Sequence, residues 1–294
     1  KAGGIIEMKK PKIRFKGYQE DWEQRKFADF TWDAGKRNKE DLDLEPYAIT
    51  NEHGFIRQRD AHDDFGYMKD TDRKAYNIVQ PNSFAYNPAR INVGSIGYYK
   101  GVENVIVSSL YEVFQTDNYV NDRFLWHWLK SDEFPRWIEK LQEGSVRLYF
   151  YYDKLCECQL YMPSLEEQEK IATFLDDLDH LITLHQRKCE ETKTLKKYML
   201  QKMFPQNGHS VPEIRFSGFT EDWEQRKLGE LGSLKNGMNF SKEAMGIGFP
   251  FVNLQNIFGN NVIDVTNLGK AMASDSQLKD YNLLNGDVLF VRSS

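Results

Sequence analysis

The longest uninterrupted helical pattern in the chain is PSLEEQEKIATFLDDLDHLITLHQRKCEETKTLKKYMLQKMF, residues 163–204, which has no glycine and a proline only at its first position. Ser164, followed three residues later by Glu167, forms the pattern of a capping box, and acidic residues in the first turn suit the helix dipole. The next residues, PQNG, are typical of a helix end. The sequence therefore predicts one helix over 164–204, roughly 60 Å long at ~1.5 Å per residue.

This predicted helix carries a heptad-like apolar stripe, which is weakened in the middle by His185, Lys188 and Thr192. A helix of this length is not stable in water by propensity alone, so the stripe must pack against something. We expect a partner helix, from a further repeat of this chain or from another chain. The residues expected to pair the helices are Ile171, Phe174, Leu178, Leu181, Leu195 and Met199.

The sequence that precedes the helix returns after it. KIRFKGYQEDWEQRKFADF (Lys12–Phe30) aligns without gaps with EIRFSGFTEDWEQRKLGEL (Glu213–Leu231), and EDWEQRK is identical in both. Looser matches join Pro46-Tyr47 to Pro250-Phe251 and Tyr76–Tyr86 to Tyr281–Val291. Solenoid repeats have units of about 20–50 residues, so this repeat indicates a duplicated domain.

Residues 30–160 predict a mixed domain. The runs PYAIT, SFAY, VIVSSLYEVFQ, VRLYFYY and QLYMP are rich in β-branched and aromatic residues and predict strands. DRFLWHWLKS and FPRWIEKLQE have the pattern of short amphipathic helices, so the fold class is α+β. The expected organisation is a tail over 1–11, a first domain over 12–160, the helix over 164–204, a linker over 205–212, and an incomplete second domain over 213–294.

Composition excludes several classes of protein. A net charge of −5 argues against a polybasic DNA binder, although Lys and Arg gathered on one face would still allow DNA binding. Cys156, Cys158 and Cys189 fit neither a disulfide framework nor a four-ligand zinc site. The sequence shows no signal peptide and no apolar run of the ~18–20 residues that cross a bilayer, so we expect a cytoplasmic protein without membrane contact.

No catalytic motif is recognisable. The phosphate-binding patterns G-x-G-x-x-G and G-x-x-x-x-G-K-[ST] do not occur. Asp60, His62, Asp63 and Asp64 could bind a divalent metal, but they lack ligand spacing and read better as a solvated loop. We therefore expect no catalytic residue and no metal site.

Together these motifs resemble the specificity subunit of type I restriction–modification systems. The resemblance covers essentially the whole chain and rests on P-x-L-x-E-Q-x-x-I (Pro163–Ile171), on W-E-Q-R-K-L-G-E-L (Trp223–Leu231) and on the weaker G-S-V-R-L (Gly144–Leu148). It implies a non-catalytic DNA reader with two target-recognition domains, each reading half of a split site. Between them, two conserved antiparallel helices act as a spacer.

The resemblance also implies partners. Modification (methyltransferase) subunits would dock on the conserved regions, and restriction (endonuclease and translocase) subunits would join them. We expect S-adenosylmethionine, ATP and Mg on those partner subunits and no cofactor in this chain. The sequence stops inside the second domain, so both a partly observed chain and a half-subunit that pairs with a second copy stay open.

The first domain offers basic residues for double-stranded DNA. Asn51 or Gln58 would suit adenine, and Tyr98, Tyr99, Tyr149, Tyr151 and Tyr152 are candidates for stacking. A surface Arg or Lys is by default only a solvated charge, and each candidate stands against that interpretation. The candidate DNA contacts are Lys36, Arg37, Arg57, Arg59, Arg73, Lys74, Arg90, Lys100 and Arg147.

Two other functions fit the same sequence. One is a helical scaffold or assembly protein that does not read DNA. The other is a fragment of a fused restriction–methylation enzyme whose catalytic domain lies outside these residues.

Overall fold

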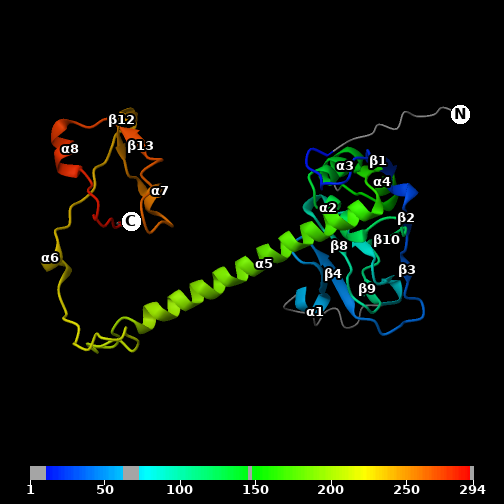
Figure 1. Ribbon diagram of the computed structural model, residues 1–294, viewed down its shortest axis with the longest axis horizontal. Coiled ribbons are helices and arrows are strands. Elements are labelled where there is room, and N and C mark those ends of the chain that lie inside the picture. The colour runs from blue at the N-terminus through cyan, green and yellow to red at the C-terminus, as the bar shows by residue number, and fades with distance from the viewer. Residues whose placement is uncertain (1–10, 62–72, 145–147, 292–294) are drawn as a thin grey trace. The chain divides into compact units, whose positions relative to one another are not determined.

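The computed structural model describes residues 11–61, 73–144 and 148–291, and the chain divides into two units, Lys1–Thr194 and Leu195–Ser294 (Figure 1). Short strands and helices are mixed along the first unit, and a helix of 38 residues, α5 (Leu165–Lys202), follows them. The predicted α+β class and the long helix are therefore confirmed. Within the described ranges, no helix combines the length and apolar character needed to span a bilayer.

A five-stranded sheet forms one half of the first unit. Its order is β3-β6-β9-β4-β5, with β4 and β9 parallel and the other neighbours antiparallel. Val79, Val105 and Val107 lie in its core, where the rings of Phe55 and Tyr99 pack at 5.2 Å. The strands are β3 (Lys36–Arg37), β4 (Pro46–Thr50), β5 (Gly54–Arg57), β6 (Asn77–Val79) and β9 (Val105–Val107).

A four-stranded antiparallel sheet, ordered β2-β10-β7-β8, forms the other half. The two sheets pack closely at Gly97 of β8, where a Cβ atom would lie 2.7 Å from the Phe55 ring, so a larger residue would force them apart. The strands are β2 (Thr31–Asp33), β7 (Phe84–Tyr86), β8 (Ile96–Tyr98) and β10 (Glu112–Thr116).

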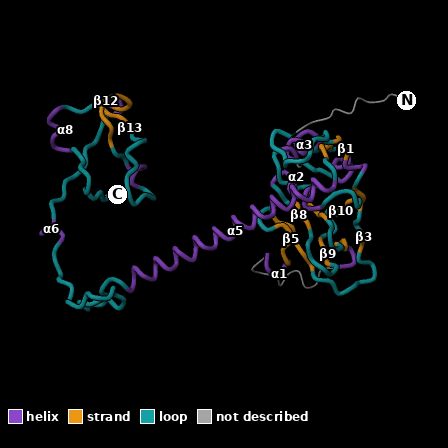
Figure 2. The backbone as a smooth tube through the Cα atoms, viewed as in Figure 1, coloured by secondary structure: helices purple, strands orange, loops and turns teal. Residues whose placement is uncertain are grey.

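Helices pack against the four-stranded sheet, and the core between the helices and the sheet is rich in aromatic residues. Asn121 caps the first of them by accepting hydrogen bonds from the backbone N–H groups of Arg123 and Phe124. Figure 2 shows these helices on one side of the first unit and the five-stranded sheet on the other. The helices are α2 (Asp122–Leu129), α3 (Glu133–Leu141) and α4 (Tyr152–Glu157); short helical turns are η1 (Phe27–Asp29), α1 (Gln58–Ala61), η3 (Arg73–Ala75) and η4 (Ile91–Val93).

A two-stranded antiparallel ladder, β1 (Glu23–Lys26) with β11 (Gln159–Met162), brings the start of the unit to the start of α5. The first turn of α5 is then held by buried polar side chains. Arg14 donates two hydrogen bonds of 2.7 Å to the Glu167 carboxylate. Gln168 accepts from the Asn121 backbone N–H at 2.8 Å and donates to the carbonyls of Tyr119 and Pro163.

Two local expectations were wrong. The run VRLYFYY is no strand in its described part: Tyr149 makes one isolated bridge to Glu143, and α4 starts at Tyr152. The aromatic residues here serve the core, because Phe150 is fully buried among Tyr86 and Phe134. The capping box at Ser164 is only half present, since its hydroxyl accepts from the Glu167 N–H while the Glu167 carboxylate binds Arg14.

The second unit buries little apolar surface. Ala271 is buried on its two-stranded ladder, whereas many larger apolar side chains, among them Ile247, Leu284 and Val288, are exposed. Pro250-Phe251 lies on a strand, as the matching Pro46-Tyr47 does, but Tyr281–Val291 forms no strand counterpart of β6 and β7. The elements are α6 (Leu228–Leu231), η5 (Lys242–Ala244), β12 (Met245–Phe251), α7 (Leu254–Ile257), β13 (Gly269–Ala271) and α8 (Asp275–Tyr281).

We predict that Gln168→Met lowers the free energy of unfolding of the first unit by about 3 kcal/mol, because methionine fills the space but leaves buried backbone groups without partners. Urea unfolding followed by circular dichroism measures this change. The matched control is Gln186→Met on the exposed part of the same helix. Equal unfolding midpoints for the two variants would contradict the role assigned to Gln168.

Candidate nucleic-acid interface

Four of the predicted DNA contacts come together at one edge of the five-stranded sheet. Lys36 and Arg37 form β3, and Arg73 and Lys74 lie in η3, which leads directly into β6, the neighbour of β3. Arg37 connects β3 to η3 by donating a hydrogen bond to the Ala75 carbonyl at 2.6 Å. We name these four residues the β3-edge basic cluster.

The ion pairs of this cluster are long and exposed. Lys74 Nζ lies 3.8 Å from Asp41, and Arg73 lies 3.9 Å from Asp43, whose side chain is fully exposed. Exposed pairs at such distances contribute little stability, so the cations can exchange a carboxylate for a phosphate. The buried Asn38 fixes the loop that carries these acids, through hydrogen bonds in both directions with Leu42.

Arg57 and Arg59 lie at the opposite edge of the same sheet. Arg57 is on the edge strand β5, with Nε 3.4 Å from the Tyr47 hydroxyl, and Arg59 in α1 is 3.5 Å from Glu45. Both side chains are exposed. The structure therefore divides the candidates between two edges and does not gather them into one patch.

The remaining basic candidates lie elsewhere. Arg90 is exposed beside η4, and Lys100 follows β8, where partial burial and the nearby Arg123 lower the pKa of its ammonium group. Arg147 falls outside the described residues. Lys39, which the sequence analysis did not select, is exposed two residues after Arg37 and extends the β3-edge surface.

The candidates for base reading differ in accessibility. Asn51 is exposed, but Gln58 is buried with its amide 3.5 Å from the Tyr47 carbonyl. Tyr99 is buried and its hydroxyl donates to the Glu103 carbonyl, so it serves the core. Tyr149 and Tyr151 stack on each other at 5.5 Å, which leaves Tyr151 partly exposed at the surface.

The apolar stripe of α5 emerges from the first unit as it runs along the helix. Ile171 packs against the aromatic core, whereas Phe174, Leu178, Leu181 and Leu195 are each about half exposed. Met199 is partly covered at the far end of the helix. The predicted helix-pairing residues beyond Ile171 therefore form a surface that remains open to a partner.

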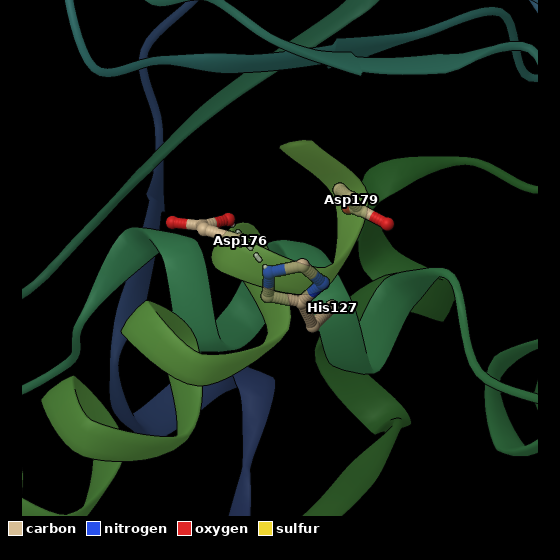
Figure 3. A group of neighbouring side chains, drawn as sticks. All are labelled: His127, Asp176 and Asp179. Atoms are coloured by element: carbon tan, nitrogen blue, oxygen red, sulfur yellow. Dashed lines mark hydrogen bonds and ion pairs between the residues drawn. The ribbon is translucent and has the colours of Figure 1, made fainter. Parts of the chain in front are cut away.

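A cluster of charged groups joins α2 to α5. Figure 3 shows His127 of α2 facing Asp176 of α5, with Nε2 2.8 Å from the carboxylate, and Asp179 one turn further along. Arg123 of α2 forms an ion pair with the same Asp176 oxygen. Because Arg123 and His127 of α2 both pair with Asp176 of α5, the cluster holds the two helices together.

The remaining reactive groups are the three cysteines and the acidic loop. Cys156, Cys158 and Cys189 are free thiols, and burial raises the pKa of Cys158 to about 12, which keeps it protonated at neutral pH. Of the acidic loop considered for a metal, Asp60 lies in α1, while His62, Asp63 and Asp64 lie outside the described residues.

The sequence analysis missed the contacts that hold α5 against the first unit. Arg14 and Glu167 are 153 positions apart, and His127 and Asp176 are 49 apart, so no local pattern joins them. The only available signal was that the P-x-L-x-E-Q motif places two polar residues where a helix meets its domain.

Two curated relatives come from Methanocaldococcus jannaschii. The type I restriction enzyme MjaVIII specificity subunit is 27% identical over 231 residues, which cover 75% of this chain and 51% of the relative. The putative type I restriction enzyme MjaX specificity subunit is 25% identical over 264 residues, which cover 82% and 61%. The chain thus spans about half to three fifths of the length of these relatives.

Among solved structures, the type I restriction–modification system S subunit from M. genitalium is similar, with 15% identity and a TM-score of 0.48 over 90% of this chain and 65% of that one. The family described as "Type I restriction modification DNA specificity domain" matches residues 19–194. This match covers more than half of the chain and confirms the resemblance seen in its motifs. The protein therefore belongs to the family of type I restriction–modification DNA specificity domains.

Proposed function

We propose that this chain is a sequence-specific DNA-recognition subunit of a type I restriction–modification complex and has no catalytic role of its own. The observation that carries the proposal is the family match over residues 19–194, which are nearly all of the first unit. Each recognition domain reads one half of a bipartite target, and the conserved helix sets the distance between the halves.

The β3-edge basic cluster supports DNA contact by the first unit. Its cations come from two adjacent elements, and Arg73 and Lys74 form long ion pairs with exposed carboxylates. Phosphate contacts of this kind orient a protein on the duplex, and a few side chains at base edges then supply specificity. The exposed Asn51 in the turn of the β4–β5 hairpin and Arg57 at the end of β5 far from that turn are the candidates for base reading.

The length of α5 supports the spacer role. Its 38 residues extend roughly 57 Å at ~1.5 Å each, which exceeds the ~34 Å of one DNA turn. The half-exposed apolar stripe needs a second helix in water, and an antiparallel helix of the same kind fits that need.

The partners follow from the same proposal. Modification subunits, carrying S-adenosylmethionine, bind the conserved helical regions, and restriction subunits, which use ATP and Mg, join them for cleavage. The cytoplasm is the compartment where such a complex meets DNA. Neither the scaffold without DNA readout nor the fragment of a fused enzyme is favoured, because the matched family is one of DNA specificity domains.

We predict that Lys36→Ala with Lys74→Ala weakens DNA binding by the complex of this chain with its modification subunits. Two lost phosphate contacts would reduce the slope of log affinity against log salt by about 2. Fluorescence anisotropy of a labelled duplex at several salt concentrations measures this slope. The control is Arg136→Ala with Lys140→Ala on α3. A similar reduction of the slope in the control would contradict the assignment of DNA contact to the β3 edge.

We also predict that Leu181→Glu with Leu195→Glu prevents assembly of the DNA-binding complex, because buried charges in a helix seam are strongly unfavourable. Both side chains are half exposed here, so the unfolding midpoint of the chain alone should not change. Size-exclusion chromatography with light scattering reports assembly. Thr183→Glu with Thr194→Glu, placed on the opposite face of α5, should assemble normally. An intact complex of the Leu181→Glu, Leu195→Glu variant would show that the apolar stripe of α5 is not the assembly interface.

A further inference from the structure

The turn between β9 and β10, Ser108–Tyr111, lies at one end of the five-stranded sheet. β9 is parallel to β4, so it leaves the sheet at the same end as the β4–β5 hairpin turn, which carries Asn51. β6 is antiparallel to β9 and starts at this end, directly after Arg73 and Lys74 of η3. β3 is antiparallel to β6 and ends here with Arg37. Strand direction therefore gathers one exposed amide, three cations of the β3-edge basic cluster and the β9–β10 turn.

The β9–β10 turn has a defined conformation. The Tyr111 N–H donates to the Ser108 carbonyl at 3.1 Å, and the Leu110 N–H donates to the Ser108 hydroxyl at 3.4 Å. The Tyr111 side chain packs against the apolar core of the five-stranded sheet. These contacts anchor the second half of the turn in the domain and leave Leu110 at its tip.

Side chains of β3 and β6 hold the same turn from outside. The Arg37 guanidinium donates to the Ser109 carbonyl at 3.3 Å as well as to the Ala75 carbonyl at 2.6 Å. The buried Asn77 amide donates to the Tyr111 carbonyl at 2.8 Å. One guanidinium thus connects the turn to η3, the element that carries two further cations.

Leu110 is an apolar side chain in this cationic setting, and it is 73% exposed. Single exposed apolar residues are common on protein surfaces, and Val102 in the β8–β9 loop, 91% exposed at the other end of β9, is an ordinary example. Leu110 differs because its backbone is held by hydrogen bonds and basic residues lie beside it. Proteins that insert apolar side chains between bases combine such a tip with cations that contact phosphates.

We propose that the Ser108–Tyr111 turn enters a DNA groove, that Leu110 is a specificity-determining residue which contacts the apolar surface of a base, and that Arg37 positions it. This inference rests on the proposed function, in which the first unit reads half of a target site. It adds an apolar reading residue that lies outside the basic candidates selected from the sequence.

The apolar surface of a base is available in two forms. The methyl group of thymine projects into the major groove, and the face of a base becomes accessible where a base step opens on the minor-groove side. Either form would bury the leucine side chain without a charge contact. The expected signature is therefore a loss of affinity for the target with no change in the salt dependence of binding.

The test uses the complex of this chain with its modification subunits. Fluorescence anisotropy compares a duplex that carries the methylated motif with a duplex in which the motif is shuffled. Leu110→Ser should weaken binding to the motif at least about tenfold, because the burial of a leucine side chain is lost. Binding to the shuffled duplex and the slope of log affinity against log salt should stay the same. Val102→Ser is the matched control and should change none of these values.

Arg37→Lys tests the positioning role separately. Lysine keeps the positive charge but lacks the planar fork that reaches two carbonyl groups. Affinity for the motif should fall while the salt slope stays the same. Adding Arg37→Lys to Leu110→Ser should weaken binding little further, because both changes remove the same base contact.

Modified duplexes identify the apolar surface. Loss of affinity when uracil replaces one thymine of the motif, seen with the unaltered chain and absent with Leu110→Ser, assigns the contact to that methyl group. A fluorescent adenine analogue that brightens on binding, with Leu110 but not with Leu110→Ser, assigns it to an opened base step. Either result supports the inference.

The inference is overturned if Leu110→Ser leaves affinity for the motif unchanged, or weakens binding to both duplexes equally. Loss of assembly with the modification subunits in Leu110→Ser, measured by light scattering, would assign Leu110 to a protein contact and would also overturn it. Discrimination between the two duplexes by the unaltered complex is a separate readout. If that discrimination is present and Leu110→Ser retains it, only the role of Leu110 is rejected; if the unaltered complex lacks it, the proposed function fails as well.

Discussion

The structure of the first unit depends on the buried polar contacts at the first turn of α5. A helix of this length in water gains no lasting stability from its own residues, so its direction must be fixed where it leaves the domain. Glu167 and Gln168 supply that fixation, because one binds Arg14 and the other binds three backbone groups of neighbouring loops. Buried polar groups are costly unless they are satisfied, and this geometry satisfies them in one arrangement of helix and domain.

The same fixation has a functional consequence. A spacer helix sets a distance only if it is rigidly attached to the module it carries. The contacts of Arg123 and His127 with Asp176 extend the attachment by more than two turns of α5. Beyond these contacts, the apolar stripe is exposed and suits a partner helix. The domain side of the attachment presents the β3-edge basic cluster on the five-stranded sheet, away from the aromatic core that holds the helix.

Much of this organisation could be predicted from the sequence, for physical reasons. The long helix contains no breaker, and its period of apolar residues continues for many turns. The strands at PYAIT and QLYMP were recognisable from β-branched and aromatic residues between turns. VRLYFYY misled because an aromatic run signals burial and not a particular backbone conformation. Phe150 is buried, as the aromatic run predicts, but it lies in an irregular segment next to a helix.

The candidate site was harder to predict because its residues meet only after folding. Lys36-Arg37 and Arg73-Lys74 were each recognisable as basic pairs, but only the pairing of β3 with β6 makes them one cluster. Glu167 had a satisfactory local explanation as a capping residue, and the Arg14 that takes its carboxylate is distant in sequence. The repeat was visible from the start, yet the difference in apolar burial between the two units required coordinates.

The central claim, that the first unit reads DNA sequence, is tested most directly by exchanging residues 30–160 for the corresponding residues of another specificity subunit. The exchanged chain is expressed with its modification subunits, and methylated adenines are then mapped across the genome. The account predicts that one half of the methylated motif changes while the other half and the spacing stay the same. An unchanged motif, with methylation still present, would contradict it.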